Sequence, residues 1–147
     1  MRKNETTARL NQVLSGIKSE DEVSDYLDAH SKNEYEYFYQ FFNDYVSRHE
    51  LDVASVHKLS RISKDYVYQI TNGKKLNPGR DKIIALCIAC GMSFSETNRA
   101  LEISGTGILY AKNERDIRIA ICINNHLLDV TRVNLYLEEH GVPILNV

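Results

Sequence analysis

The apolar residues of this chain recur almost everywhere at the three- and four-residue spacing of an α-helix. The clearest case runs from residue 38 to residue 46, where five large side chains fall on one helical face: Phe38, Phe41, Phe42, Tyr45 and Val46. A helix with so wide an aromatic face must bury it against other elements. Only residues 108–110 read as extended, which is too short to build a sheet. The sequence therefore predicts an all-α protein of about seven or eight short helices.

Helix boundaries are marked by capping signals. Gly91 and Gly141 suit the left-handed residue that commonly follows a helix, and Pro78 suits a first helical position. The expected helices cover about residues 53–60, 64–72, 79–90, 94–103, 113–126 and 129–140, besides those nearer the N-terminus. The caps are the serine–glutamate boxes Ser19 with Glu22, Ser31 with Glu34 and Ser93 with Glu96, and the single caps Ser63, Asn113 and Asp129.

The run Gly105-Thr106-Gly107 is the best candidate for a boundary between a core and a tail. We interpret residues 32–104 as the core domain, residues 1–31 as an N-terminal helical extension and residues 105–147 as a C-terminal one. The extensions either wrap the core or form a dimer interface. Two apolar stripes at helical spacing are candidates for that interface: Leu10, Val13, Leu14 and Ile17, and Val130, Val133 and Leu137.

Several features indicate a cytoplasmic protein. No apolar run approaches the ~18 residues that span a bilayer. The basic residues at the N-terminus are not followed by the apolar stretch of a signal peptide. The three cysteines lie in apolar surroundings, which is typical of reduced, buried thiols.

Charge is unevenly distributed, although the net charge is only −2. Residues 19–50 hold nine acids and two bases, a net of −7, whereas residues 58–82 hold seven bases and two acids, a net of +5. Because the local potential governs encounter, the basic segment can attract a polyanion. The acidic segment 19–50 is a possible surface for a protein partner, and an ordinary solvated surface remains the alternative for both segments.

The basic segment contains an unusual short helix. It opens on Ser63, carries Val67 and Ile70 toward a core, and stops at Asn72-Gly73 before further lysines. Other features flank this helix along the chain. Before it stand the apolar residues Val56 and Ile62, and after it stands Pro78, ahead of the apolar residues Ile83, Ile84, Cys87 and Cys90. The turn Gly91-Met92-Ser93 follows.

In this order the region from about Phe38 to Ile103 resembles the phage-repressor type of helix-turn-helix, the Cro/XRE family. The segments Tyr66-Val67-Tyr68-Gln69-Ile70, Leu109-Tyr110-Ala111-Lys112 and Arg115-Asp116 are similar to a group of small bacterial members with extra terminal helices. The resemblance implies a five-helix core and a regulator that binds double-stranded DNA, commonly as a homodimer. In two places the chain departs from the family: His57 stands where the family has a small residue, and Arg61 stands where it has a glycine. At that turn either Arg61 adopts a positive φ, at a cost of about 1 kcal/mol, or the turn is reshaped.

The resemblance also implies roles for individual residues, because the second helix of the motif enters the major groove. The base-reading residues would be Lys64, Asp65, Tyr66 and Gln69. The phosphate-contacting residues would be Ser63, Asn72, Lys74, Lys75 and Arg80.

Two other classes of function are alternatives to DNA binding. The same fold serves as a protein-interaction module that does not bind DNA. Cys87 and Cys90, with Cys122 and His126, have spacings that would suit a zinc site if the pairs met. Buried thiols acting as small apolar side chains are the favoured interpretation. The histidines at 30, 49, 57, 126 and 140 have no nucleophile motif beside them, so we expect neither enzyme activity nor a cofactor or metal.

Overall fold

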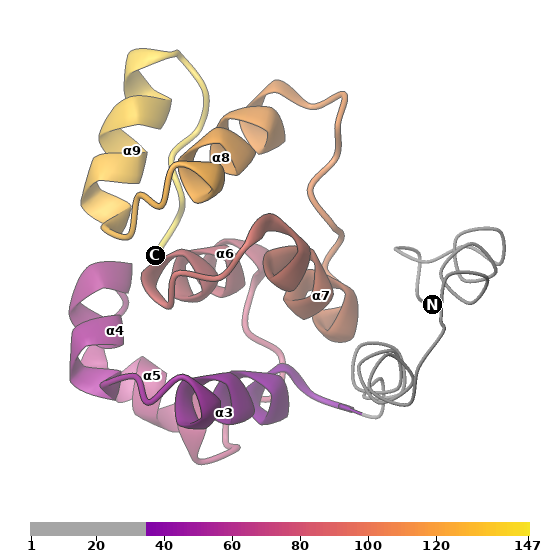
Figure 1. Cartoon of the computed structure of the whole chain (residues 1–147), viewed down its shortest axis with the longest axis vertical. Coiled ribbons are helices and arrows are strands. Elements are labelled where there is room, and N and C mark those ends of the chain that lie inside the picture. Colours follow the sequence, from indigo (N-terminus) through magenta and orange to yellow (C-terminus); the bar gives the residue numbers. More distant parts are fainter. Residues whose placement is uncertain (1–34) are drawn as a thin grey trace, which may run out of the picture.

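The structure is a computed structural model that describes residues 35–147. Within this range every regular element is an α-helix and no residue forms a strand, which confirms the all-α prediction (Figure 1). The helices are α3 (Phe38–Arg48), α4 (Val53–Ser60), α5 (Lys64–Thr71), α6 (Arg80–Ala89), α7 (Phe94–Ser104), α8 (Glu114–Asn124) and α9 (Val130–Glu139).

Helix α6 lies at the centre of the fold. Its residues from Ile83 to Ala89, and Cys90 beyond it, are all buried. A helix that is apolar on every side must be surrounded, and α6 packs against α4, α7 and α9. Helix α3 packs on α5 and α7, which completes the lower part of the molecule in Figure 1.

Most predicted helix starts are confirmed. In the Ser93–Glu96 box, Ser93 Oγ accepts from the Glu96 N–H at 3.1 Å and Glu96 Oε1 accepts from the Ser93 N–H at 2.8 Å. The side chains of Ser63, Asn113 and Asp129 also accept from backbone N–H groups at the starts of α5, α8 and α9.

Two starts differ from prediction. Helix α6 begins at Arg80, one residue after the expected start at about 79, because Gly79 has extended backbone with ψ 161°. Pro78 therefore precedes the helix rather than standing at its first position. Helix α3 begins at Phe38, where Gln40 Oε1 reaches back to the N–H groups of Glu36 and Tyr37.

Residues 105–147 share one continuous core with residues 35–104. Helix α8 packs on α7 and α9, and α9 packs on α4 and α6. Val130, Val133 and Leu137 are fully buried in that core, so this stripe offers no surface for a dimer. Leu145 is buried too, held by the Asn134 side chain, which accepts from its N–H at 2.8 Å.

Some predictions lie outside the described residues. They are the extension 1–31 with its stripe Leu10, Val13, Leu14 and Ile17, the capping boxes at Ser19 and Ser31, and the larger part of the acidic segment 19–50. Among the helices that are described, none combines the length and the apolar character needed to cross a bilayer.

Candidate nucleic-acid interface

The turn between α4 and α5 is short and tightly held. Arg61 adopts the left-handed conformation with φ 65°, the first of the two outcomes expected for this turn. His57 Nδ1 lies 2.7 Å from the carbonyl oxygen of Ile62, and a carbonyl only accepts, so Nδ1 donates. Ser60 Oγ accepts from the Ile62 N–H and donates to the His57 carbonyl. The His57 and Ser60 side chains therefore hold the turn between α4 and α5.

Helix α5 has one buried face and one exposed face. Val67 and Ile70 are 1% and 0% exposed and pack into the core. Lys64, Asp65 and Tyr68 point away from it and are exposed. The C-terminal end of the helix is anchored by Asn43 of α3, whose Nδ2 donates to the Thr71 carbonyl at 2.8 Å. The outer face of α5 is thus rigidly positioned but open to a partner.

The turn after α5 holds two lysines in place. Asn72 Oδ1 accepts from the Lys74 N–H at 3.0 Å, and the Gln69 carbonyl accepts from the Lys75 N–H at 2.9 Å. Gly73 has φ +82°, and a side chain there would meet the Tyr39 ring of α3 at 3.4 Å. Glycine is required at this position by its backbone conformation. Both lysine side chains are exposed beside the end of α5.

Lysines lie over tyrosine rings along this surface. Lys64 Nζ is 5.8 Å from the centre of the Tyr68 ring. Lys75 Nζ and Lys82 Nζ are 5.3 and 5.2 Å from the centre of the Tyr66 ring. Tyr66 is half-buried, and burial raises the pKa of its hydroxyl. The Tyr66 ring therefore contacts the ammonium groups of both Lys75 and Lys82, and its hydroxyl is a further polar group beside them.

The sequence did not assign a role to Tyr68 or Lys82. Tyr68 follows Lys64 by one helical turn, a spacing that places two side chains on one face and could have identified it. Lys82, in the first turn of α6, lies over the Tyr66 ring of α5 only because the fold brings these two side chains together. No local pattern in the sequence carries that information.

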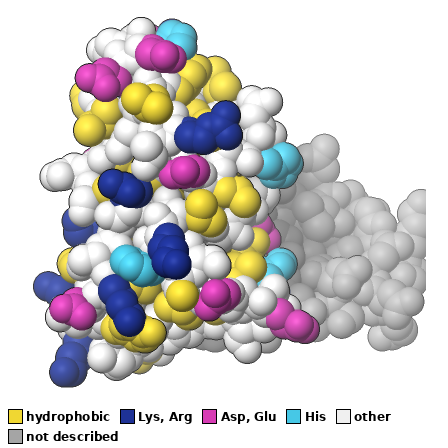
Figure 2. Space-filling view, turned by 90° about the vertical axis from the view of Figure 1, so that its left-hand side faces the viewer, with side chains coloured by type: hydrophobic (Ala, Val, Ile, Leu, Met, Phe, Trp, Pro, Cys, Tyr) yellow, Lys and Arg dark blue, Asp and Glu magenta, His cyan; other side chains and the backbone are white. Residues whose placement is uncertain are grey.

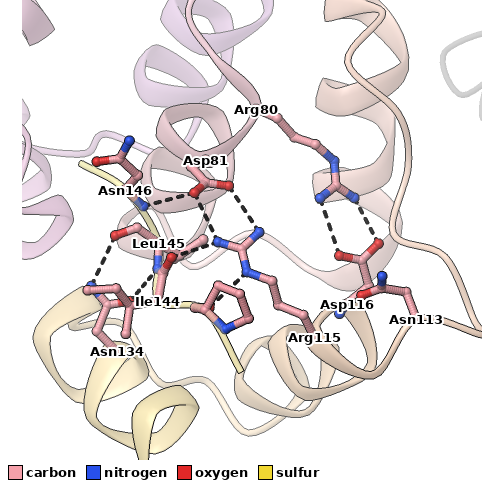
Figure 3. Close-up of polar contacts among 10 residues, drawn as sticks. Arg80, Asp81, Asn113, Arg115, Asp116, Asn134, Ile144, Leu145 and Asn146 are labelled. Carbon is pink, nitrogen blue, oxygen red and sulfur yellow. Dashed lines mark hydrogen bonds and ion pairs between the residues drawn. The ribbon is translucent and has the colours of Figure 1, made fainter. Parts of the chain in front are cut away.

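Arg80 does not belong to this surface. Its guanidinium donates to both carboxylate oxygens of Asp116, at 3.2 and 2.9 Å (Figure 3). It also donates to the carbonyls of Gly107 and Ile108, at 2.9 and 3.1 Å. These bonds occupy the side chain in joining α6 to α8. The phosphate-contacting role predicted for Arg80 is therefore replaced by a structural one.

Figure 2 views the molecule from the side that carries α4 and α9. Lys and Arg side chains gather at the lower left, on the half of the molecule that contains α4 and α5. Lys58 and Arg61 are exposed in the same region of the chain and add to its charge. Acidic side chains lie among and around these bases rather than forming a separate block.

The cysteines lie in the core. Cys87, Cys90 and Cys122 are buried and unbonded to one another. Burial raises the pKa of the Cys90 thiol to about 12 and raises those of Cys87 and Cys122 as well. Within residues 35–147 no three His, Cys, Asp or Glu side chains come together in a way that could hold a metal ion.

Comparison with protein-family models, curated proteins and solved structures found no match to this chain. The interpretation of the surface therefore rests on its geometry and chemistry.

Proposed function

We propose that this protein is a cytoplasmic, sequence-specific DNA-binding regulator of transcription that reads the major groove with α5. The observation that carries the proposal is the arrangement around α5. Its outer face exposes Lys64, Asp65 and Tyr68, and the turn after it fixes Lys74 and Lys75 alongside. An α-helix fits the major groove, and cations beside it suit the flanking phosphates.

Base readout would come from the outer face of α5, where Lys64, Asp65 and Tyr68 are exposed and Gln69 is half-buried. The Gln69 amide can bond adenine N6 and N7 together, and Lys64 can donate to guanine O6 and N7. Asp65 can accept from a cytosine amine, which also makes it a source of discrimination against other bases. Tyr68 joins this set because of its exposure, while the role of Tyr66 shifts toward holding Lys75 and Lys82.

Phosphate contacts would come from Ser63, Asn72, Lys74 and Lys75. The two lysines supply charge, which accounts for most of the affinity of such complexes. Ser63 Oγ accepts from the Tyr66 N–H at 3.2 Å, which leaves its own O–H able to donate. The Asn72 side-chain oxygen is engaged with Lys74, which leaves its NH₂ group as the donor.

A single α5 covers too few base pairs for high specificity, so we expect two copies to bind one operator. The dimer surface is not the Val130, Val133 and Leu137 stripe, which is buried within the chain.

The test is a fluorescence-anisotropy titration with a random-sequence duplex pool, at ~50 mM salt and at physiological salt. Wild-type protein should bind with strong salt dependence. The double variant Lys74→Ala/Lys75→Ala should bind every sequence more weakly and lower the slope of log K against log salt by about 2. The control Lys112→Ala/Arg132→Ala removes the same charge from exposed positions outside this surface and should leave the slope almost unchanged.

Absence of binding at low salt would overturn the proposal. An equal loss in the two double variants would show that binding depends on overall charge rather than on the α5 surface. Either result would favour the interaction module that the same fold supports.

A further inference from the structure

An apolar patch lies on the surface where α7 meets α8. It consists of Phe94, Tyr110, Ile117 and Ile121, which are 38%, 59%, 42% and 41% exposed. The first three line a hollow of about 210 Å³ together with Leu109 and Ala120, and Ile121 follows Ile117 by one helical turn. Contiguous apolar surface of this kind usually marks a place where another segment or molecule packs.

The hollow accepts apolar groups rather than polar ones. The carboxylate in its wall is that of Asp116. Its carboxylate accepts from Arg80 at both oxygens and from the Tyr110 N–H at 2.8 Å. A hydrogen-bonding ligand would have to compete with these internal donors, whereas an aliphatic side chain needs no polar partner.

We propose that the N-terminal stripe of the same chain, Leu10, Val13, Leu14 and Ile17, covers the α7–α8 patch. These residues have the spacing of one apolar helical face, while Gln12, Ser15 and neighbouring polar residues fall outside it. Such a stripe requires a complementary apolar surface to bury itself. This inference does not depend on DNA binding.

The described chain begins beside α7. The Tyr35 ring meets the Phe41 ring of α3 edge-on at 5.7 Å, and α3 packs on α7. Phe94 is the first residue of α7, which is 11 residues long, a rise of about 16 Å. The patch is therefore within a short distance of the point where the N-terminal segment joins the core.

The start of α7 is also tied directly to α3. The hydroxyl of Tyr45 donates to Glu96 Oε1 at 3.3 Å, two residues beyond Phe94. Between Ile17 and Tyr35 lie residues 18–34. A chain of that length spans up to about 55 Å when extended, so it easily reaches the patch.

The experiment uses the full chain with a nitroxide spin label on Ser15→Cys and ¹³C-labelled isoleucine δ1 methyl groups observed by NMR. The native thiols are buried, so the new cysteine should take the label selectively. The methyl signals of Ile117 and Ile121 should lose most of their intensity. Those of Ile62 and Ile70, at the α4–α5 turn and on α5, should be retained.

Adding Leu14→Asp to the labelled chain should restore the signals of Ile117 and Ile121, because a charge cannot be buried in an apolar hollow. The matched change Gln12→Asp, on the polar side of the stripe, should leave the loss intact. The inference is overturned by no loss at Ile117 and Ile121, or by equal loss at Ile62 and Ile70. A second copy is tested by mixing nitroxide-labelled protein with isotope-labelled protein that carries no nitroxide. Loss of the Ile117 and Ile121 signals in that mixture would also overturn the inference, because a second chain would then cover the patch.

Discussion

The guanidinium of Arg80 and the carboxylate of Asp116 form a two-pronged ion pair across 36 residues of sequence. The next residue, Asp81, forms the reciprocal pair with Arg115, at 3.1 and 2.9 Å. Two Arg–Asp dipeptides, one opening α6 and one in the first turn of α8, thus exchange partners (Figure 3). They fasten the C-terminal helices to the helix that directly follows the Lys74 and Lys75 turn.

Removing Asp116 should destabilise the fold strongly. The change Asp116→Ala leaves the half-buried Arg80 guanidinium and the Tyr110 N–H without their acceptor. We expect the free energy of unfolding to fall by about 2–4 kcal/mol in urea denaturation. Glu114→Ala breaks only an exposed pair with Arg118 and should cost less than about 1 kcal/mol. Equal losses in the two variants would contradict this account.

Stability should decline in acid partly through Asp81. Burial raises the pKa of this carboxyl. Hydrogen bonds from Arg115 and the Asn146 N–H, with the charges of Arg115 and Arg80, outweigh that effect and hold the pKa below its usual value. The stabilisation is therefore present above the unfolded pKa of about 4 and is lost as the pH falls through the folded value.

The variant Asp81→Asn tests this sign. It should be less stable than wild type at pH 7, and the difference in urea midpoint should shrink progressively below about pH 4. If the difference in urea midpoint between the two proteins stays constant from pH 7 to pH 2.5, the ionised Asp81 carboxylate contributes nothing to the free energy of unfolding.

Glycine should be preferred over arginine at position 61. Arg61 holds φ 65°, which costs an ordinary residue about 1 kcal/mol. Arg61→Gly should therefore raise the free energy of unfolding by about 0.5–1 kcal/mol, as measured by urea denaturation. Arg61→Ala keeps the strain and serves as the control. A destabilised Arg61→Gly variant would mean that the exposed arginine side chain makes a contact that outweighs the strain.

Gln69 should determine sequence preference rather than general affinity. Once a preferred duplex has been selected from a random pool, Gln69→Ala should weaken binding to it by about 1–3 kcal/mol. Binding to unrelated duplexes should change little, because their complexes rest on phosphate contacts. Uniform weakening on all duplexes would remove Gln69 from the base-reading set.

The three thiols should be almost unreactive in the folded protein. Burial raises the pKa values of Cys87, Cys90 and Cys122, so little thiolate exists at pH 8. Ellman's reagent should label all three quickly in denaturant and only slowly in buffer. Rapid labelling of one thiol in buffer would reveal local opening around it.

Much of the fold could be predicted locally. The bounds of α4 and the caps Ser63, Ser93, Asn113 and Asp129 follow from short-range rules, because a capping side chain bonds an N–H only two or three residues away. The outward face of α5 followed in the same way from the burial of Val67 and Ile70. Pro78 is not the first residue of α6, because Gly79 follows it with extended backbone and caps the helix.

The sequence by itself determined the helical class, most helix boundaries and the basic segment 58–82, because these depend on neighbours within one or two helical turns. Only the tertiary structure decided that Arg80 serves Asp116, that Lys82 lies over Tyr66 and that the Val130 stripe is buried inside the chain. Those pairings join residues 16 or more positions apart. Their choice depends on how several helices pack at once, which no single stretch of sequence specifies.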